Sequence, residues 1–226
     1  MLTNVCLRPQ IKRNAITMSV AGGVLFTLGL MLFLLLPQWF GPALVLFTLG
    51  VLGLVIGVTK WREPDISLEL TSEGLTFYHR RGSVFIAWSN VQRLDTLRVE
   101  QDFNQVELPY LGIKLKHLNP VLDNISPRLA TGLLTEQRPL LMTAATQDED
   151  LNDYEHQMAL EFTPLVLGAE HYSGVLAMFG HRAQKLNQIL GYHLYIPADS
   201  FDRSLPEAKQ LLRQFQQAHI SQEILK

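Results

Sequence analysis

The stretch that decides the architecture of this chain is residues 14–59, NAITMSVAGGVLFTLGLMLFLLLPQWFGPALVLFTLGVLGLVIGVT. These 46 consecutive residues contain no Asp, Glu, Lys or Arg. An α-helix rises about 1.5 Å per residue, so roughly 20 apolar residues cross a hydrocarbon layer about 30 Å thick. The stretch therefore predicts two membrane-spanning helices, at 15–36 and 43–59, and excludes a wholly soluble protein.

The two predicted helices are joined by residues 37–42, PQWFGP, whose two prolines and glycine stop a helix. Trp39 in this turn and Trp61 after the second helix carry the side chain that favours the membrane–water interface. A cleaved signal peptide is the alternative for the first helix. It needs a shorter apolar region and a small-residue cleavage site before the second apolar segment, which the sequence lacks. Residues 1–62 are therefore predicted to form a transmembrane hairpin.

Only basic side chains flank the hairpin, and residues 1–62 contain no acidic residue. The five flanking cations are Arg8, Lys12, Arg13, Lys60 and Arg62. Basic flanks stay on the cytoplasmic side of a membrane, and the connecting turn carries no charge. The pattern predicts a multi-pass membrane protein whose N- and C-termini both lie in the cytoplasm.

Small residues recur along both predicted helices and form ridges that let helices approach closely. The ridges are Ser19, Gly23 and Thr27 on the first helix and Gly50, Gly53 and Gly57 on the second. We expect them to pack the hairpin on itself, and homo-oligomerisation through Gly53 and Gly57 is the alternative. Because neither span contains a charged residue to carry an ion or a proton, transport by this anchor alone is not expected.

After residue 62 the sequence changes to alternating apolar and polar residues, which is typical of half-buried strands. Four meandering antiparallel strands are predicted first, and a fifth follows at 110–115. Helices are predicted within 120–134, at 170–190 and after Ser204, where Glu207 completes a capping box. The remaining predicted strands are at 138–146, 157–167 and 192–196.

Residues 63–226 carry 14 basic and 21 acidic side chains, a net charge of −7. Nucleic-acid binding requires a dominant positive surface, so no nucleic-acid partner is expected. The single cysteine, Cys6, excludes an internal disulfide and a thiolate metal cluster.

The seven histidines do not show the spacing of a metal site. The acidic segment 147–153 lacks the glycine of a calcium-binding loop, and Ser173 near His171 lacks the Gly-x-Ser-x-Gly setting of a nucleophile. We therefore predict no catalytic residue, no cofactor and no bound metal.

Arg80 and Arg81 fall at a predicted hairpin turn and are candidate lipid-contact residues, together with Lys60 and Arg62. Each basic side chain near an anionic leaflet contributes about 1 kcal/mol of attraction. The alternative is that the turn is charged only because it is solvated. Trp88 shares a face with apolar strand neighbours and is predicted to be a core residue.

Three motifs follow the hairpin in order: ISLELT at 66–71, EGLTF at 73–77 and IAWSNV at 86–91. With YLGIKL at 110–115 and GYHLYIP at 191–197, they resemble the bacterial pleckstrin-homology-like (PH-like) membrane proteins. The chain also resembles an uncharacterised family of bacterial membrane proteins. The resemblance implies an α+β protein, in which a two-helix N-terminal transmembrane hairpin precedes a cytoplasmic PH-like antiparallel β domain at 63–226. Inserted strands and a helix at 138–181 and a C-terminal capping helix complete this domain.

The function expected from these features is that of a non-catalytic protein of the bacterial inner membrane, whose PH-like module binds a partner protein or the anionic lipid surface. One alternative is a membrane-associated enzyme acting on a lipid or envelope-derived substrate, in which His171, Ser173 and His181 lie beside a pocket. Another is a structural subunit of a membrane complex.

Overall fold

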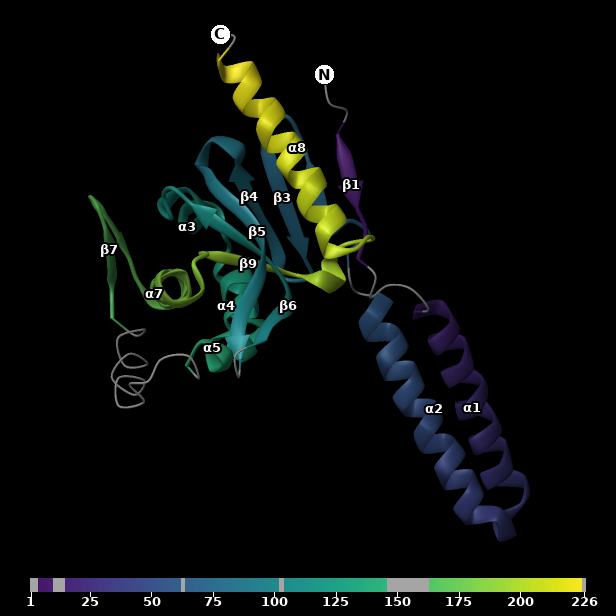
Figure 1. Ribbon diagram of the computed structural model, residues 1–226. Helices are drawn as coiled ribbons and strands as arrows, with labels where there is room; N and C mark the ends of the chain where they lie inside the picture. Colours follow the sequence, from purple (N-terminus) through teal and green to yellow (C-terminus); the bar gives the residue numbers. More distant parts are fainter. Residues whose placement is uncertain (1–3, 10–14, 62–63, 102–103, 146–162, 225–226) are drawn as a thin grey trace. The chain divides into compact units, whose positions relative to one another are not determined.

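The computed structural model describes residues 4–9, 15–61, 64–101, 104–145 and 163–224 (Figure 1). The chain divides into two compact units. One unit is Pro9–Asp65, which we call the hairpin unit, and the other combines Met1–Arg8 with Ile66–Lys226, which we call the α+β unit. The sequence-based boundary at residue 62 assigns the first eight residues to the hairpin, whereas the structure assigns them to the α+β unit.

The hairpin unit consists of α1 (Ala15–Leu35), the short 3₁₀ helix η2 (Pro37–Trp39) and α2 (Phe40–Trp61). Both α-helices are long and apolar enough to cross a membrane, and few of their side chains are buried. Helix α2 begins three residues before the predicted start because Pro42 lies in its first turn, where proline is tolerated.

The two helices of the hairpin approach so closely that several glycines have no room for a side chain. A Cβ at Gly50 would lie 2.3 Å from the backbone nitrogen of Phe26, and one at Gly22 would lie 2.6 Å from that of Leu54. A Cβ at Gly29 would lie 2.5 Å from the nitrogen of Phe47. The expectation that the hairpin packs on itself through small residues therefore agrees with the structure.

The ridge on α2 is the predicted one, since Gly53 contacts Gly22 and Gly57 contacts Ser19 within the same hairpin. The ridge on α1 runs through Gly22 and Gly29 instead of Gly23 and Thr27. The Thr27 hydroxyl donates to the carbonyl oxygen of Gly23 in its own helix. Gly22 and Gly29 are seven residues apart, as are Gly50 and Gly57, and this is the repeat that keeps one seam of a helix pair in contact.

The α+β unit begins with a strand that the sequence analysis does not predict, β1 (Val5–Leu7). It pairs antiparallel with β2 (Leu68–Leu70), with Val5 opposite Leu70 and Leu7 opposite Leu68. The hairpin unit is therefore inserted in the connection between two neighbouring strands of one sheet.

Two antiparallel sheets form the body of the α+β unit. The first has the order β1-β2-β3-β4 and the second the order β5-β6-β9, and a separate pair joins β7 to β8. The prediction of a four-strand meander after the hairpin is wrong in its last member, because a turn of 3₁₀ helix, η3 (Trp88–Asn90), redirects the chain and β5 opens the second sheet. The strand bounds are β3 (Gly74–His79), β4 (Gly82–Ala87), β5 (Val91–Gln101), β6 (Asn104–Leu115), β7 (Leu165–Leu167), β8 (Glu170–Tyr172) and β9 (Leu194–Pro197).

The helices of the α+β unit partly follow the prediction. Helices α3 (Asn119–Asn124) and α4 (Pro127–Glu136) are the two expected short helices, and the Ser126 hydroxyl oxygen caps α4 by accepting from the Leu129 N–H at 3.2 Å. Helix α8 (Leu205–Ile224) has the expected capping contact, since the Ser204 N–H donates to Glu207 Oε2 at 3.2 Å. In Figure 1, α8 is the long yellow helix that lies along β5.

One prediction in the inserted segment is wrong, and another is right except for where the helix begins. Residues predicted as a strand at 138–146 form α5 (Arg138–Ala145), because a short apolar run does not distinguish a strand from a helix by periodicity. Helix α7 (Gly174–Leu190) begins later than predicted because Glu170–Tyr172 forms β8. Of the strand predicted at 157–167, the structure describes Leu165–Leu167 as β7, and 157–162 lie outside the described residues.

The core of the α+β unit lies between the sheets, α8 and the inserted helices. Trp88 is 1% exposed, and its Nε1–H donates to the carbonyl oxygen of Thr71 at 2.9 Å. The prediction that Trp88 belongs to the core is confirmed. Helix α8 adds Ala208, Leu212 and Phe215 to the same cluster.

Candidate functional site

The strand register places the turn with Arg80 and Arg81 at a particular end of the first sheet. Leu7 pairs with Leu68, Leu68 with Phe77, and Phe77 with Val84. At this end β1 and β3 finish and β2 and β4 begin. The turn therefore lies at the same end of the sheet as the two points where the chain leaves for the hairpin and returns from it. We call this the linker end of the sheet.

A small polar cluster fixes the turn at the linker end. Glu136 Oε1, at the end of α4, lies 3.1 Å from His79 Nε2 and 3.4 Å from Arg80 Nη2. The Arg81 N–H donates to His79 Nδ1 at 3.3 Å. Because Nδ1 accepts a hydrogen bond, the ring proton is on Nε2 and is donated to Glu136. Both ring nitrogens are thus engaged, so His79 ties the turn to α4 and is not available as a general base.

The same cluster sets the charge of Glu136. The hydrogen bond from His79 lowers the pKa of this carboxyl, and the charges of Arg80 and Arg81 act in the same direction, while burial opposes them. Glu136 is therefore ionised at neutral pH and offsets part of the positive charge of the turn. Arg81 also packs against α4, where a Cβ at Gly132 would lie 2.7 Å from its Cδ.

The other predicted lipid-contact residues lie outside the α+β unit. Lys60 is in the last turn of α2, in the hairpin unit, and Arg62 lies outside the described residues. The structure adds Arg8, which is exposed and directly follows β1 at the linker end. The sequence analysis counts Arg8 only as a hairpin flank, because a three-residue strand gives no detectable alternation.

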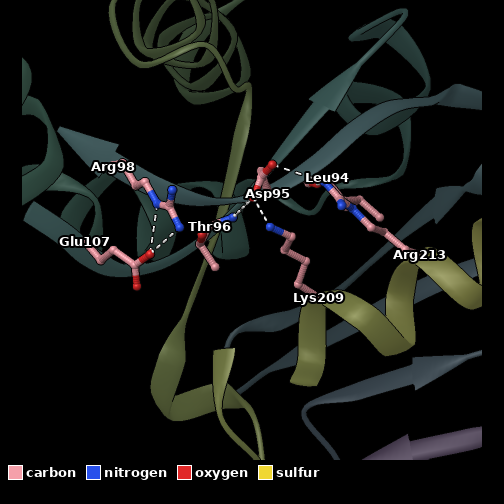
Figure 2. Close-up of polar contacts among 7 residues, drawn as sticks. All are labelled: Leu94, Asp95, Thr96, Arg98, Glu107, Lys209 and Arg213. Atoms are coloured by element: carbon pink, nitrogen blue, oxygen red, sulfur yellow. Dashed lines mark hydrogen bonds and ion pairs between the residues drawn. The ribbon is translucent and has the colours of Figure 1, made fainter. Parts of the chain in front are cut away.

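A second polar cluster joins α8 to the edge of β5 (Figure 2). Asp95 accepts from Lys209 Nζ, from Arg213 Nη2 at 3.1 Å and from the Thr96 N–H at 2.8 Å. Arg213 Nη2 also donates to the Leu94 carbonyl oxygen at 3.0 Å. An edge strand leaves backbone groups unpaired, and here a side chain of α8 supplies a donor. The arrangement is that of a structural clamp.

The clamp predicts a stability effect at Asp95. Burial alone would raise the pKa of this carboxyl, but the hydrogen bonds from Lys209 and Thr96 and the charges of Lys209 and Arg213 outweigh it and lower the pKa. Asp95→Asn is expected to lower the free energy of unfolding by about 1 kcal/mol at pH 7, since the pair is partly exposed. Because the folded state favours the charged form, this contribution is present above about pH 4 and is lost as pH falls through the lowered pKa.

Urea unfolding of the full chain in detergent at pH 7 and pH 3 measures this effect. The matched control is Glu107→Gln, which breaks the exposed ion pair between Arg98 and Glu107, whose atoms are 2.7 Å apart (Figure 2). The control is expected to change stability by less than about 0.5 kcal/mol. An Asp95→Asn effect that is no larger than the control, or that does not become smaller between pH 7 and pH 3, would contradict the clamp.

In the part of the chain that the structure describes, the residues considered for catalysis form no hydrogen bonds with one another. His171 is exposed on β8, Ser173 precedes α7, and His181 Nε2 lies 3.1 Å from the Thr163 carbonyl oxygen. Within the described ranges, no three His, Cys, Asp or Glu side chains are grouped to hold a metal ion.

The fold defines a class of mixed helix and antiparallel-sheet proteins in which two apolar helices are inserted behind the first strand. A family model described as "Protein of unknown function (DUF2982)" matches residues 68–218, from β2 into α8, so the chain belongs to this family. The expectation of an uncharacterised family is confirmed to this extent. Comparison with curated proteins and comparison with solved structures both find no match.

Proposed function

We propose that this is a non-catalytic protein of the bacterial inner membrane, whose cytoplasmic PH-like module binds a partner protein or the anionic lipid surface. The observation that carries the proposal is the insertion of the hairpin between β1 and β2. Since these strands pair, both ends of the hairpin return to one sheet. This supports a hairpin that enters and leaves the membrane on the same side.

The surface of the hairpin supports membrane insertion. Its helices expose many large apolar side chains, including Ile16, Leu34, Leu35 and Val45, each at least 59% exposed. Soluble proteins rarely leave so large an apolar surface bare, and a hydrocarbon layer would cover it. A signal peptide cleaved after α1 would also remove β1 from its sheet, which disfavours that alternative.

The arrangement of strands supports a PH-like module. Sheets of four and three antiparallel strands, followed by a C-terminal helix, agree with the architecture that the resemblance implies. In this proposal, residues 138–181, which lie between β6 and β9 in the sequence, are the insertion.

The short connection between α2 and β2 supports contact between the linker end and the lipid surface. Six residues separate Trp61 from Leu68, and the seven Cα–Cα steps between them span at most about 25 Å when extended. Leu68, at the linker end, is therefore joined to the end of α2 by a short connection. Because the net charge of −7 opposes adsorption of the domain as a whole, any attraction to anionic lipid must be local.

The lipid contact is tested by vesicle cosedimentation of a variant in which a short Gly/Ser loop replaces residues 9–65, so that β1 is kept. We expect weak binding to phosphatidylglycerol vesicles at low salt and none to phosphatidylcholine vesicles. Arg80→Glu with Arg81→Glu is expected to abolish binding by reversing the local charge.

The matched control for this test is Arg98→Glu with Lys114→Glu, which changes the net charge equally but on β5 and β6 of the second sheet. Circular dichroism verifies that all variants are folded. Equal binding to both vesicle types, or equal losses in both double variants, would refute lipid contact. A protein partner would then be the favoured alternative.

The proposed topology predicts the location of reporter fusions in a bacterial host. Fusions at Thr3 and at Lys226 are expected to report the cytoplasm, and a fusion at Gln38, in the turn between α1 and α2, is expected to report the opposite side. A periplasmic signal at Lys226 would reverse the assignment.

A further inference from the structure

We propose that a polar cleft in the α+β unit, away from the linker end, binds a small ligand through an oxyanion, either a carboxylate or a phosphate. The cleft has a volume of about 530 Å³, which falls within the size range of small-molecule sites. Its walls are the segment 116–119 after β6, the turn 167–170 between β7 and β8, Gln184 on α7, and His193 before β9.

The first wall of the cleft is held in place by a buried side chain. Asn90 is 8% exposed, its Nδ2 donates to the His117 carbonyl oxygen at 2.8 Å, and its Oδ1 accepts from the His117 N–H at 2.9 Å. These two bonds fix the backbone that carries Lys116. Such a fixed backbone reduces the ordering cost of binding a ligand.

The opposite wall is fixed by α3. Asn119 Nδ2 donates to the Leu167 carbonyl oxygen at 3.1 Å, which holds the β7–β8 turn. The hydroxyl of the buried Tyr172 lies 2.8 Å from Asp123 Oδ1 and 2.9 Å from Glu170 Oε2. Its proton serves one carboxylate at a time, and the Glu170 carboxylate belongs to this wall. The wall therefore disfavours ligands that bring a second anionic group to it.

The donors for an oxyanion come from Lys116, His193 and Gln184. His193 Nδ1 accepts from the Leu115 N–H at 3.1 Å, so the ring proton is on Nε2. Burial, assisted by the charge of Lys114, lowers the pKa of this imidazole, which makes it a neutral N–H donor at pH 7. Among the described residues, neither His193 Nε2 nor the Lys116 ammonium has a hydrogen-bond partner. A cation and an N–H donor are thus unengaged in one fixed cleft.

The test uses the full chain in phosphatidylcholine nanodiscs, titrated with glycerol phosphate and with lactate. Side-chain ¹⁵N signals of the histidines report binding, and the His193 signal is the one lost in His193→Gln. We expect a saturable shift of the His193 Nε2 signal with at least one probe. Lys116→Gln is expected to raise the Kd at least fivefold, because it removes the charge-assisted contact.

Arg128→Gln is the matched control, since it also removes one positive charge, from an exposed position on α4 outside the cleft lining. It is expected to change the Kd by less than twofold. A His193 signal that does not saturate with either probe, or equal weakening of binding by Lys116→Gln and Arg128→Gln, overturns the proposal.

A second arm distinguishes the source of the oxyanion. In nanodiscs that contain phosphatidylglycerol, a His193 signal already shifted before titration assigns the cleft to a lipid headgroup. An unshifted signal that still responds to glycerol phosphate or lactate assigns it to a soluble ligand. Arg80→Glu with Arg81→Glu separates this site from the lipid contact at the linker end, because this double variant is expected to leave the His193 signal unchanged.

Discussion

Trp88→Ala is expected to lower the free energy of unfolding of the α+β unit by about 3–5 kcal/mol. The indole is 1% exposed, so its removal leaves a large cavity between the two sheets. The Thr71 carbonyl oxygen also loses its hydrogen bond from Nε1. Urea unfolding of the full chain in detergent, followed by far-ultraviolet circular dichroism, measures the loss.

Trp61→Ala is the matched control, because this tryptophan is 69% exposed and belongs to the hairpin unit. It is expected to leave unfolding of the α+β unit unchanged. An unaltered unfolding midpoint for Trp88→Ala, together with loss of lipid or partner binding, would instead make Trp88 a binding residue.

Removal of β1 is expected to destabilise the α+β unit by about 2–4 kcal/mol. Leu7 is fully buried, and its carbonyl oxygen accepts from the Ser67 N–H at 2.9 Å and from the Ser67 hydroxyl at 3.1 Å. The comparison is between residues 66–226 alone and the variant in which a Gly/Ser loop replaces residues 9–65. The loop variant keeps β1 and is expected to unfold at the higher urea concentration.

Leu7→Ala in the loop variant removes the buried side chain but keeps the strand pairing. It is expected to lower the free energy of unfolding by about 2 kcal/mol or more. Equal stability of the two forms, with and without β1, would show that this strand is dispensable. The lipid-binding test could then use residues 66–226 alone in place of the loop variant.

The sequence predicts those elements whose signals are local and periodic. The two apolar helices, the alternation that gives β2, β3 and β4, and the capped amphipathic helix α8 are all of this kind. Strand β1 has three residues and a partner about 60 positions away, beyond the hairpin, so no local pattern reveals it. The change of sheet between β4 and β5 depends on how the indole of Trp88 packs, which alternation does not encode.

The candidate sites also combine local features that the sequence predicts with long-range contacts that it does not. Composition and turn spacing place Arg80 and Arg81 at a hairpin turn, but their partner Glu136 comes from α4, 56 residues after Arg80. The clamp joins Asp95 to Lys209 across 114 residues, and the cleft joins Lys116 to His193. Long-range pairing of this kind follows from the packing of elements. The spacing of histidines along the sequence tests only for metal-binding motifs, so it does not reveal that His193 lies in a cleft with Lys116.

The insertion of the hairpin between paired strands also dictates the order of events during synthesis. In the proposed topology, β1 leaves the ribosome first, and its partner β2 follows only after both helices have been made. A chain that inserted only one helix would hold β1 and β2 on opposite sides of the membrane, and the edge of β2 would stay unpaired. Exposed strand edges promote aggregation and attract proteases. In the proposed topology, the first sheet therefore closes only in chains whose membrane insertion is complete, and incorrectly inserted chains are expected to keep an exposed strand edge.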